Sequence, residues 1–336
     1  MRVILPSTTI SDVARAAQVG VGTVSRVLNN HPAVHPDTRS RVLAVIEALG
    51  YQPNPHARRI AGGRSYTVSI MLPMVEAEFY TRLLTAMEET LSAQRYDSAL
   101  FPLLGRARLE RYLSSNRLAY QADGVIMVTY DLASLFEGGR LPTECPVVLV
   151  DGYSDRYDCA YVDNYLGGLL AGRAAAKYPG ELYVLSLEDD PEGLFVNRIF
   201  QDRMRGLGDG LAEAGKRITA NYLCALHYRG GQQAAERLFR EAGRPCTVFA
   251  AADLLAVPVL EEAERQGWRV GRDIRVIGFD DQPWASAQGL TTVHQPVELL
   301  GQTAAQLLLE RLDGLVGPAR SVRFEPELVE RRSTLG

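Results

Sequence analysis

The first fifty residues carry apolar side chains at helical spacing in three short segments. Thr9 and Asp12 occupy the positions of a capping box, with Asp in place of the usual Glu or Gln. The apolar residues that follow on one helical face are Ile10, Val13, Ala14 and Ala17. After a tight turn at residues 18–20, a second helix is expected over about Val21–Asn29, and a third begins near Pro36. The pattern therefore predicts a small bundle of three helices.

The second predicted helix has two chemically different faces. Its apolar residues are Val24, Val27 and Leu28, and its outward residues are Gly22, Ser25, Arg26 and Asn29. One face can therefore pack on the first helix while the other lies in a major groove of DNA. There Arg26 can donate two hydrogen bonds to a guanine edge, and Val21 can touch a thymine methyl group. The side chains available to hold phosphates are those of Thr9, Thr23 and Ser25.

Charge separates this segment from the rest of the chain. Residues 1–65 contain eight Arg and three acidic residues, a net charge of +5, whereas the whole chain carries −4 and the remainder therefore −9. A basic head on an acidic body is the distribution required if only the head binds the phosphate backbone. The alternative for the helix-turn-helix pattern alone is a small helical core without a nucleic-acid function.

A short basic segment, Tyr51–Ile60, follows the three helices. Asn54 is a good N-cap, and Pro55 suits the first position of a helix. A helix of two turns is unstable alone in water, because the cost of nucleation is not recovered. A minor groove could hold it, with Ile60 as an apolar wedge between base steps and Arg58 or Arg59 on phosphates. The alternative is a basic interdomain linker.

From Tyr66 onward, short apolar runs alternate with helical stretches. The runs in the first half are Thr67–Leu72, Ser98–Leu103, Gly124–Val128 and Val147–Val150. Those in the second half are Leu182–Leu187, Tyr222–Leu226, Val248–Ala251 and Val276–Phe279. Continuous apolar runs separated by helices are typical of parallel sheets that are covered on both faces. We therefore predict two doubly wound α/β lobes, with a cleft between them in which a small ligand can bind.

Several classes of protein are disfavoured by the same sequence. No run is apolar enough to span a bilayer, and the N-terminus lacks the apolar core of a signal peptide, so we expect a cytoplasmic protein without a membrane partner. The four Cys have no ligand-like spacing, and of the five His only His227 and His294 lie in the body. The nucleotide-binding, hydrolase and zinc-protease motifs are absent. We therefore expect no catalytic site, metal site or cofactor.

Together these motifs resemble the lactose repressor / galactose repressor (LacI/GalR) family of bacterial transcription regulators. The matching segments are Thr9–Ala14, Thr23–Asn29, Leu49–Tyr51, Pro53-Asn54, Ala57-Arg58, Val276–Asp281, Leu290–Val293, Gln295-Pro296 and Pro326–Arg331. The resemblance implies a multidomain protein, with an all-α helix-turn-helix head and a two-lobed α/β core like that of periplasmic binding proteins. The expected divisions are a head at 8–53, a hinge helix and linker at 54–65, an N-terminal lobe at 66–162 with 292–323, and a C-terminal lobe at 163–291 with 324–336.

The resemblance also assigns roles to particular residues. Arg203 matches the family's effector-binding arginine, and Asp280 matches the acid that accepts hydrogen bonds from ligand hydroxyls. The residues expected at DNA are Thr9, Val21, Gly22, Thr23, Ser25, Arg26, Asn29, Asn54, Ala57, Arg58 and Ile60. The residues expected at the effector are Phe79, Tyr80, Arg203, Asp280 and Trp284. Two positions depart from the family pattern. Gly22 occupies a position that reads a base in the family, but it has no side chain to do so. Ala252 stands where the family usually has an Asn that contacts the ligand.

The expected function is that of a sequence-specific transcriptional regulator; a repressor is favoured, and the sequence leaves an activator open. It would bind a pseudo-palindromic operator in double-stranded DNA as a homodimer, and a small sugar-like or nucleoside-like effector in the cleft would modulate its affinity. Two alternatives stay open on the sequence alone. One is a solute-binding α/β protein, and the other is a regulator controlled by a protein partner rather than by a small ligand.

The proposed wedge gives the first testable prediction. Ile60→Gly should lower the affinity for operator DNA, because it removes the apolar side chain that would enter between base steps and also disfavours the helix. Fluorescence anisotropy on operator DNA measures the change. Unchanged specific affinity would contradict the wedge.

Overall fold

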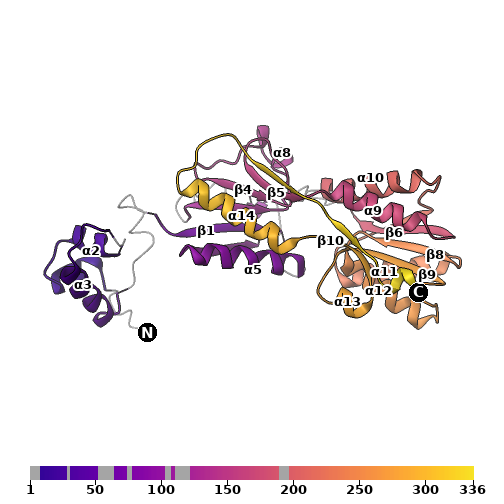
Figure 1. Cartoon of the computed structure of the whole chain (residues 1–336), viewed down its shortest axis with the longest axis horizontal. Coiled ribbons are helices and arrows are strands. Elements are labelled where there is room, and N and C mark those ends of the chain that lie inside the picture. The colour runs from indigo at the N-terminus through magenta and orange to yellow at the C-terminus, as the bar shows by residue number, and fades with distance from the viewer. Residues whose placement is uncertain are drawn as a thin grey trace. The chain divides into compact units, whose positions relative to one another are not determined.

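A computed structural model of the chain describes residues 8–28, 31–51, 64–73, 78–102, 107–109, 122–188 and 197–336. The chain divides into two compact units, residues 1–65 and residues 66–336. Figure 1 traces both units from the N-terminus to the C-terminus. Each unit has a hydrophobic core of its own.

The first unit contains the three predicted helices, α1 (Ile10–Ala16), α2 (Val21–Leu28) and α3 (Pro36–Ala48). Thr9 caps α1: its hydroxyl accepts a hydrogen bond from the Asp12 backbone N–H, and the Asp12 carboxylate accepts one from the Thr9 backbone N–H. The predicted capping box is therefore confirmed. The buried residues of this unit form one apolar cluster: Val13, Ala14, Ala17, Val24, Val27 and Val42.

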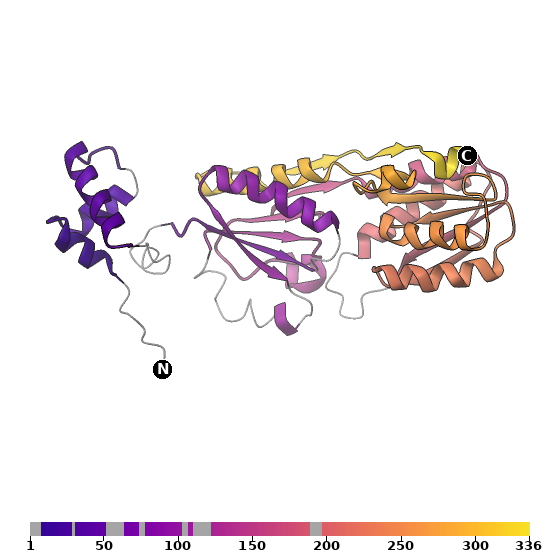
Figure 2. The same cartoon turned by 90° about the horizontal axis from the view of Figure 1, so that it is seen from below.

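The first lobe of the second unit is a parallel six-stranded sheet in the order β11-β5-β4-β3-β1-β2. Its strands are β1 (Thr67–Leu72), β2 (Asp97–Pro102), β3 (Gly124–Val128), β4 (Val147–Val150), β5 (Asp158–Val162) and β11 (Ser321–Phe324). Helices α5 (Glu78–Ala93) and α14 (Val297–Leu312) pack side by side on one face (Figures 1 and 2). Short segments α8 (Leu132–Leu135) and η1 (Glu137–Gly139) lie among the connections.

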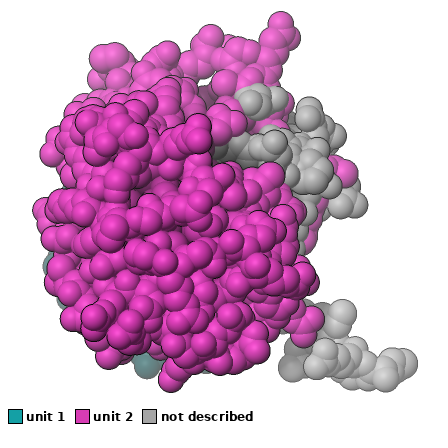
Figure 3. Space-filling model, turned by 90° about the vertical axis from the view of Figure 1, so that its right-hand side faces the viewer, with its two compact units in different colours: residues 1–65 teal, residues 66–336 magenta. Residues whose placement is uncertain are grey.

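The second lobe is a six-stranded sheet in the order β12-β10-β9-β8-β6-β7. Its strands are β6 (Glu181–Leu187), β7 (Ala220–Cys224), β8 (Cys246–Ala250), β9 (Ile274–Asp280), β10 (Thr291–His294) and β12 (Glu327–Val329). The helices are α9 (Asn164–Ala176), α10 (Asn197–Ala212), α11 (Tyr228–Glu241), α12 (Asp253–Arg265), α13 (Ala285–Gln288) and α15 (Arg332–Leu335). Two apolar clusters, one on each side of the sheet, hold the α9/α10 and α11/α12 pairs to it. Figure 3 shows one face of the second unit, whose described residues are drawn in magenta.

The predicted fold class is confirmed: a helical head precedes a two-lobed α/β core with parallel sheets. The strand order corrects two expected boundaries. Phe324, expected in the second lobe, belongs to the first, because it ends β11 and pairs with Val162. Residues 292–294, expected in the first lobe, belong to the second, because Thr291–His294 forms β10 and pairs in parallel with β9. The chain therefore crosses between the lobes at Gln295 and Pro296. The sheet of the second lobe also carries one antiparallel strand, β12, at its edge.

Asp158 anchors the last strand of the first lobe. Its carboxylate is buried and accepts hydrogen bonds from the guanidinium groups of Arg311 on α14 and Arg320 before β11, at 2.7 to 3.1 Å. It also accepts one from the Arg320 backbone N–H at 2.8 Å. Burial acts to raise the pKa of this carboxyl, but the hydrogen bonds outweigh burial and lower the pKa to about 2. One charged side chain thus joins β5, β11 and α14.

Removing this charge should destabilise the protein. Asp158→Asn should lower the free energy of unfolding at pH 7 by about 3 kcal/mol, because two guanidinium groups lose their buried counter-charge. The pKa is lower in the folded than in the unfolded state. The stabilisation should therefore be complete above about pH 4 and should disappear as the pH falls towards 2. Urea denaturation followed by circular dichroism at several pH values measures both effects.

The matched control is Glu213→Gln, since Glu213 pairs with Arg173 on the surface at 2.7 Å and both side chains are half exposed. An exposed pair contributes less than about 1 kcal/mol. Equal losses in the two variants would contradict the anchoring role of Asp158.

Candidate functional site

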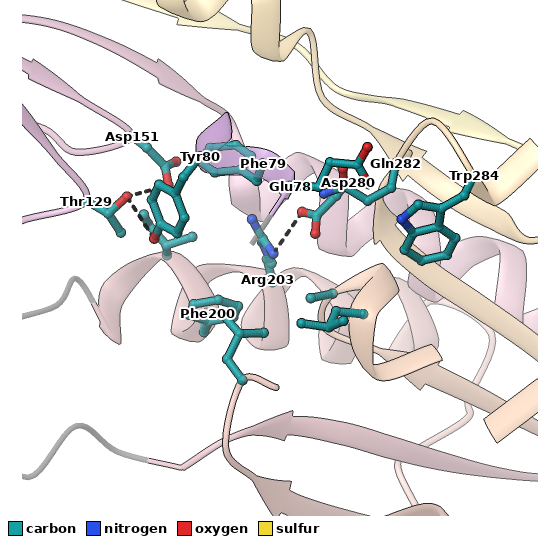
Figure 4. Close-up of a pocket in the computed structure, with 14 residues that line it drawn as sticks. Glu78, Phe79, Tyr80, Thr129, Asp151, Phe200, Arg203, Asp280, Gln282 and Trp284 are labelled. Carbon is teal, nitrogen blue, oxygen red and sulfur yellow. Dashed lines mark hydrogen bonds and ion pairs between the residues drawn. The ribbon is translucent and has the colours of Figure 1, made fainter. Parts of the chain in front are cut away.

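A pocket lies between the two lobes of the second unit, at the carboxyl ends of several strands. The first lobe contributes Glu78, Phe79, Tyr80, Thr129 and Asp151, and the second contributes Ile199, Phe200, Arg203, Leu226, Ala252, Leu254, Asp280, Gln282 and Trp284. The ends of parallel strands are where α/β folds bind ligands. All five residues predicted at the effector line this one pocket (Figure 4).

Arg203 is the buried cation of the pocket, with only 4% of its surface exposed. Its Nε donates to Asn164 Oδ1 and its Nη1 to the carbonyl of Ala251, each at 2.7 Å. Nη1 also lies 3.7 Å from the Asp280 carboxylate, and the guanidinium sits 3.7 Å from the centre of the Phe279 ring. Burial lowers the pKa of Arg203, and the neighbouring carboxylate of Asp280 opposes this effect. The guanidinium group is thus held in place by Asn164, by the Ala251 carbonyl and by Asp280.

The close contact of α9 with α10 places Arg203. A Cβ atom added at Gly168 of α9 would lie 2.0 Å from the carbonyl oxygen of Arg203, and one at Gly206 of α10 would lie 2.0 Å from that of Tyr165. The two backbones therefore approach closer than any side chain permits. This close approach places the backbone of Arg203 near the start of α9, where the Arg203 side chain donates a hydrogen bond to Asn164.

Asp280 ends β9, and its carboxylate lies beside the Arg203 guanidinium (Figure 4). Gln295 donates from Nε2 to its Oδ1 at 2.7 Å. Burial raises the pKa of Asp280 to about 6, although the charge of Arg203 and the hydrogen bonds from Gln295 and Gln282 act to lower it. Asp253 lies behind this site and has a structural role. Its carboxylate is fully buried and accepts hydrogen bonds from Thr292 and from the backbone of Gln282.

The first lobe presents a chain of hydroxyl and carboxyl groups to the pocket. Tyr80 Oη donates to Thr129 Oγ1 at 3.5 Å, and Thr129 donates to Asp151 Oδ2 at 3.3 Å. Burial raises the pKa of both Tyr80 and Asp151. Thr129, Asp151 and Asp280 all have positive φ angles, of 60°, 52° and 123°. Backbone strain of this kind in non-glycine residues is typical of functional sites.

Sequence reasoning missed four polar residues of this pocket, Thr129, Asp151, Gln282 and Glu78. A signal for the first two was present, because each directly follows a fully buried apolar strand, β3 or β4. A polar residue at the carboxyl end of such a strand is placed at the cleft edge of the sheet. Gln282 gives no comparable signal, since its position depends on the turn after β9.

The first unit presents the predicted DNA-facing residues on α2. Val21, Gly22 and Arg26 are exposed, and Arg26 Nε donates to the Gly22 carbonyl at 3.2 Å. Thr23 and Ser25 are half-buried, and the hydroxyl of Thr9 takes part in the capping box. Five further residues expected at DNA lie outside the described residues: Asn29, Asn54, Ala57, Arg58 and Ile60.

The part of the chain that the structure describes contains neither a metal-binding cluster nor a membrane-spanning helix. Its His, Cys, Asp and Glu side chains form no group of three or more that could hold a metal ion. None of its helices has the length and apolar character needed to cross a membrane.

A helix-turn-helix unit together with a two-lobed α/β core whose cleft is lined by buried charges defines a DNA-binding regulator with a ligand-binding core. Comparison with known proteins supports this class. The family described as "Bacterial regulatory proteins, lacI family" matches residues 9–54, and the "Periplasmic binding protein-like domain" matches residues 191–334. The HTH-type transcriptional repressor PurR of Erwinia tasmaniensis is 30% identical over 344 residues, which cover 97% of this chain and 96% of that repressor.

Two solved structures extend the comparison. A probable transcription regulator from Thermus thermophilus is 47% identical, with a TM-score of 0.69 over 79% of this chain and 97% of its own. The Lac repressor dimer bound to operator and the anti-inducer ONPF is 23% identical and shares the fold, with a TM-score of 0.83 over 98% of this chain and 100% of its own. The chain belongs to the LacI family of bacterial transcription regulators, whose members are not enzymes.

The glycine contact between α9 and α10 gives a prediction. Gly168→Ala should lower the free energy of unfolding by about 1–3 kcal/mol, because the new Cβ forces the helices apart. Gly208→Ala is the matched control, since Gly208 lies on α10 and a Cβ added there would have no atom within 4 Å. It should stabilise the protein by about 0.5–1 kcal/mol. Thermal unfolding of both variants measures the difference, and similar stabilities would contradict the contact.

Proposed function

We propose that this protein is a repressor that binds a pseudo-palindromic operator as a homodimer and responds to a small molecule in the cleft between its lobes. The observation that carries the proposal is the pocket itself. Its buried charged groups, Asp151 from one lobe and Arg203 and Asp280 from the other, converge on one space. The protein would act in the cytoplasm, where its DNA lies.

The DNA-binding part rests on α2. Its exposed face carries the Arg26 guanidinium, with no large side chain at Gly22 beside it, and the unit of residues 1–65 has a net charge of +5. Such a helix can enter a major groove, and two copies would read half-sites about 34 Å apart or a multiple of that distance. The Lac repressor, which has the same fold, is described as a dimer bound to operator.

The ligand-binding part rests on the position of the pocket. A molecule that contacts Asp151 and Asp280 together binds both lobes, so it must favour one degree of closure over another. In a dimer, such closure would alter the separation of the two segments 54–65 that lead to the heads. The helix predicted at residues 54–60 is too short to be stable alone, so a small change in the separation of the two copies can decide whether it folds on DNA.

Selection from random duplexes with the purified full-length protein tests the proposal as a whole. We expect a pseudo-palindromic sequence to emerge, and specific affinity to fall steeply between 50 and 200 mM salt, about 10³-fold or more for six or more phosphate contacts. Absence of any preference over random duplex, with sugars and nucleosides present or absent, would refute it.

Arg26 gives a prediction at the level of one base pair. Arg26→Ala should weaken operator binding by about 1–3 kcal/mol and relax the preference at a single position of each half-site. Arg15→Ala, an exposed arginine of α1, is the control and should change the affinity for all sequences equally. Anisotropy on a set of single-base operator variants separates the two. A uniform loss in Arg26→Ala would mean that Arg26 holds only phosphate.

A further inference from the structure

Two residues that line the interlobe pocket each have a buried side-chain oxygen without a hydrogen-bond partner among the described residues: Asp151 Oδ1 and Gln282 Oε1. Both side chains are almost fully buried, with exposures of 4% and 5%. The amide nitrogen of Gln282 bonds to the Asp280 carboxylate, which can only accept, so the oxygen of the same amide must be the unpaired atom. Buried acceptors of this kind are costly to a fold unless another molecule supplies the donors.

The two acceptors belong to different lobes. Asp151 follows β4 in the first lobe, and Gln282 follows β9 in the second. Figure 4 shows them on opposite sides of the Arg203–Asp280 pair. A molecule with two separated donor groups can therefore bond to both and hold the lobes together.

The charges of the pocket restrict that molecule further. Among the described residues that line it, three are carboxylic acids (Glu78, Asp151 and Asp280) and one is a cation, Arg203. The Arg203 guanidinium is already engaged by Asp280, by Asn164 and by the Ala251 carbonyl, and the Phe279 ring covers it. These hydrogen bonds use two of its five N–H groups, and its charge is already balanced by Asp280. A ligand anion would therefore add uncompensated charge beside the carboxylate of Asp151 in a site of low dielectric constant.

We infer that the cleft binds a ligand without an anionic group, neutral or cationic, that donates one hydrogen bond to Asp151 and another to Gln282 and packs an apolar face on the Phe79, Phe200 and Trp284 side chains. Phosphorylated sugars, nucleotides and carboxylic acids are thereby excluded. This inference rests on the proposed function of the cleft as an effector site. It makes Asp151 and Gln282 determinants of ligand class.

Matched pairs of compounds test the excluded class. Thermal unfolding of the full-length protein without DNA is measured with ribose and ribose 5-phosphate, glucose and glucose 6-phosphate, adenosine and adenosine monophosphate, and with glucosamine as a cationic compound. We expect any stabilising compound to be neutral or cationic, and its phosphorylated partner to bind at least tenfold more weakly. A larger shift with the phosphorylated member of a pair would overturn the inference.

The variant Asp151→Asn tests the role of the carboxylate itself. The amide keeps the shape and can still accept from Thr129, but it removes the unpaired charge. Because burial raises the pKa of Asp151 above its ordinary value, the ionised form disfavours folding at pH 8, and the ligand-free variant should unfold at the same temperature as the wild type or higher. Its affinity for the stabilising compound should fall at least tenfold, and its discrimination against the phosphorylated partner should narrow.

The control is Asp209→Asn, at a surface aspartate of α10 that accepts from Tyr165 Oη at 2.8 Å. It should leave both the affinity and the discrimination unchanged. An Asp151→Asn protein that unfolds at a lower temperature than the wild type would show that Asp151 is structural and would overturn the inference. Unchanged affinity and discrimination in Asp151→Asn would overturn it as well.

The same compounds added to operator DNA and protein distinguish this inference from the proposed function. If a phosphorylated compound both binds more tightly and changes operator affinity, the ligand class is wrong while the effector site stands. If a neutral compound binds at Asp151 and operator affinity does not respond, the ligand class stands and the proposed function fails.

Discussion

The burial of one positive charge is the constraint on which the second unit depends. Removing a guanidinium from water costs several kcal/mol unless charge and hydrogen bonds replace the water. For Arg203 the replacement comes from Asn164 on α9, from the Ala251 carbonyl after β8 and from Asp280 at the end of β9. Three elements distant in sequence must therefore be in place together, and the pocket forms where they meet.

Backbone geometry makes this meeting possible. The glycines of α9 and α10 let two helices approach to distances that no side chain would allow, and Arg203 projects from that contact onto the Phe279 ring. On the opposite wall, Thr129 and Asp151 adopt positive φ angles immediately after buried strands. The sheet and the helix pair thus place polar residues, some with strained backbones, around one cleft. The stability of the surrounding fold offsets the free-energy cost of these strained residues.

The two lobes are connected so that the pocket can respond to what it binds. The chain crosses between the sheets after β5, after β10 and between β11 and β12, and Asp158 fixes β11 and α14 within the first lobe. These bonds hold the first lobe together, and the three crossings join the two lobes around the pocket. This arrangement suits a regulator, because a molecule that bonds to both walls selects a relative position of the lobes rather than deforming either one.

Short-range sequence patterns were sufficient to predict much of the fold and part of the site. Apolar spacing predicted the helices of the head, the Thr9–Asp12 capping box needed only four residues, and family motifs pointed to Arg203 and Asp280. Contacts between distant segments were beyond such signals. Only strand pairing assigns Thr291–His294 to the second lobe, and only the assembled cleft places Asp151 and Gln282 opposite each other. The physical reason is that periodicity reports whether a residue is buried, whereas its partners are set by strand order and by how closely two backbones can approach.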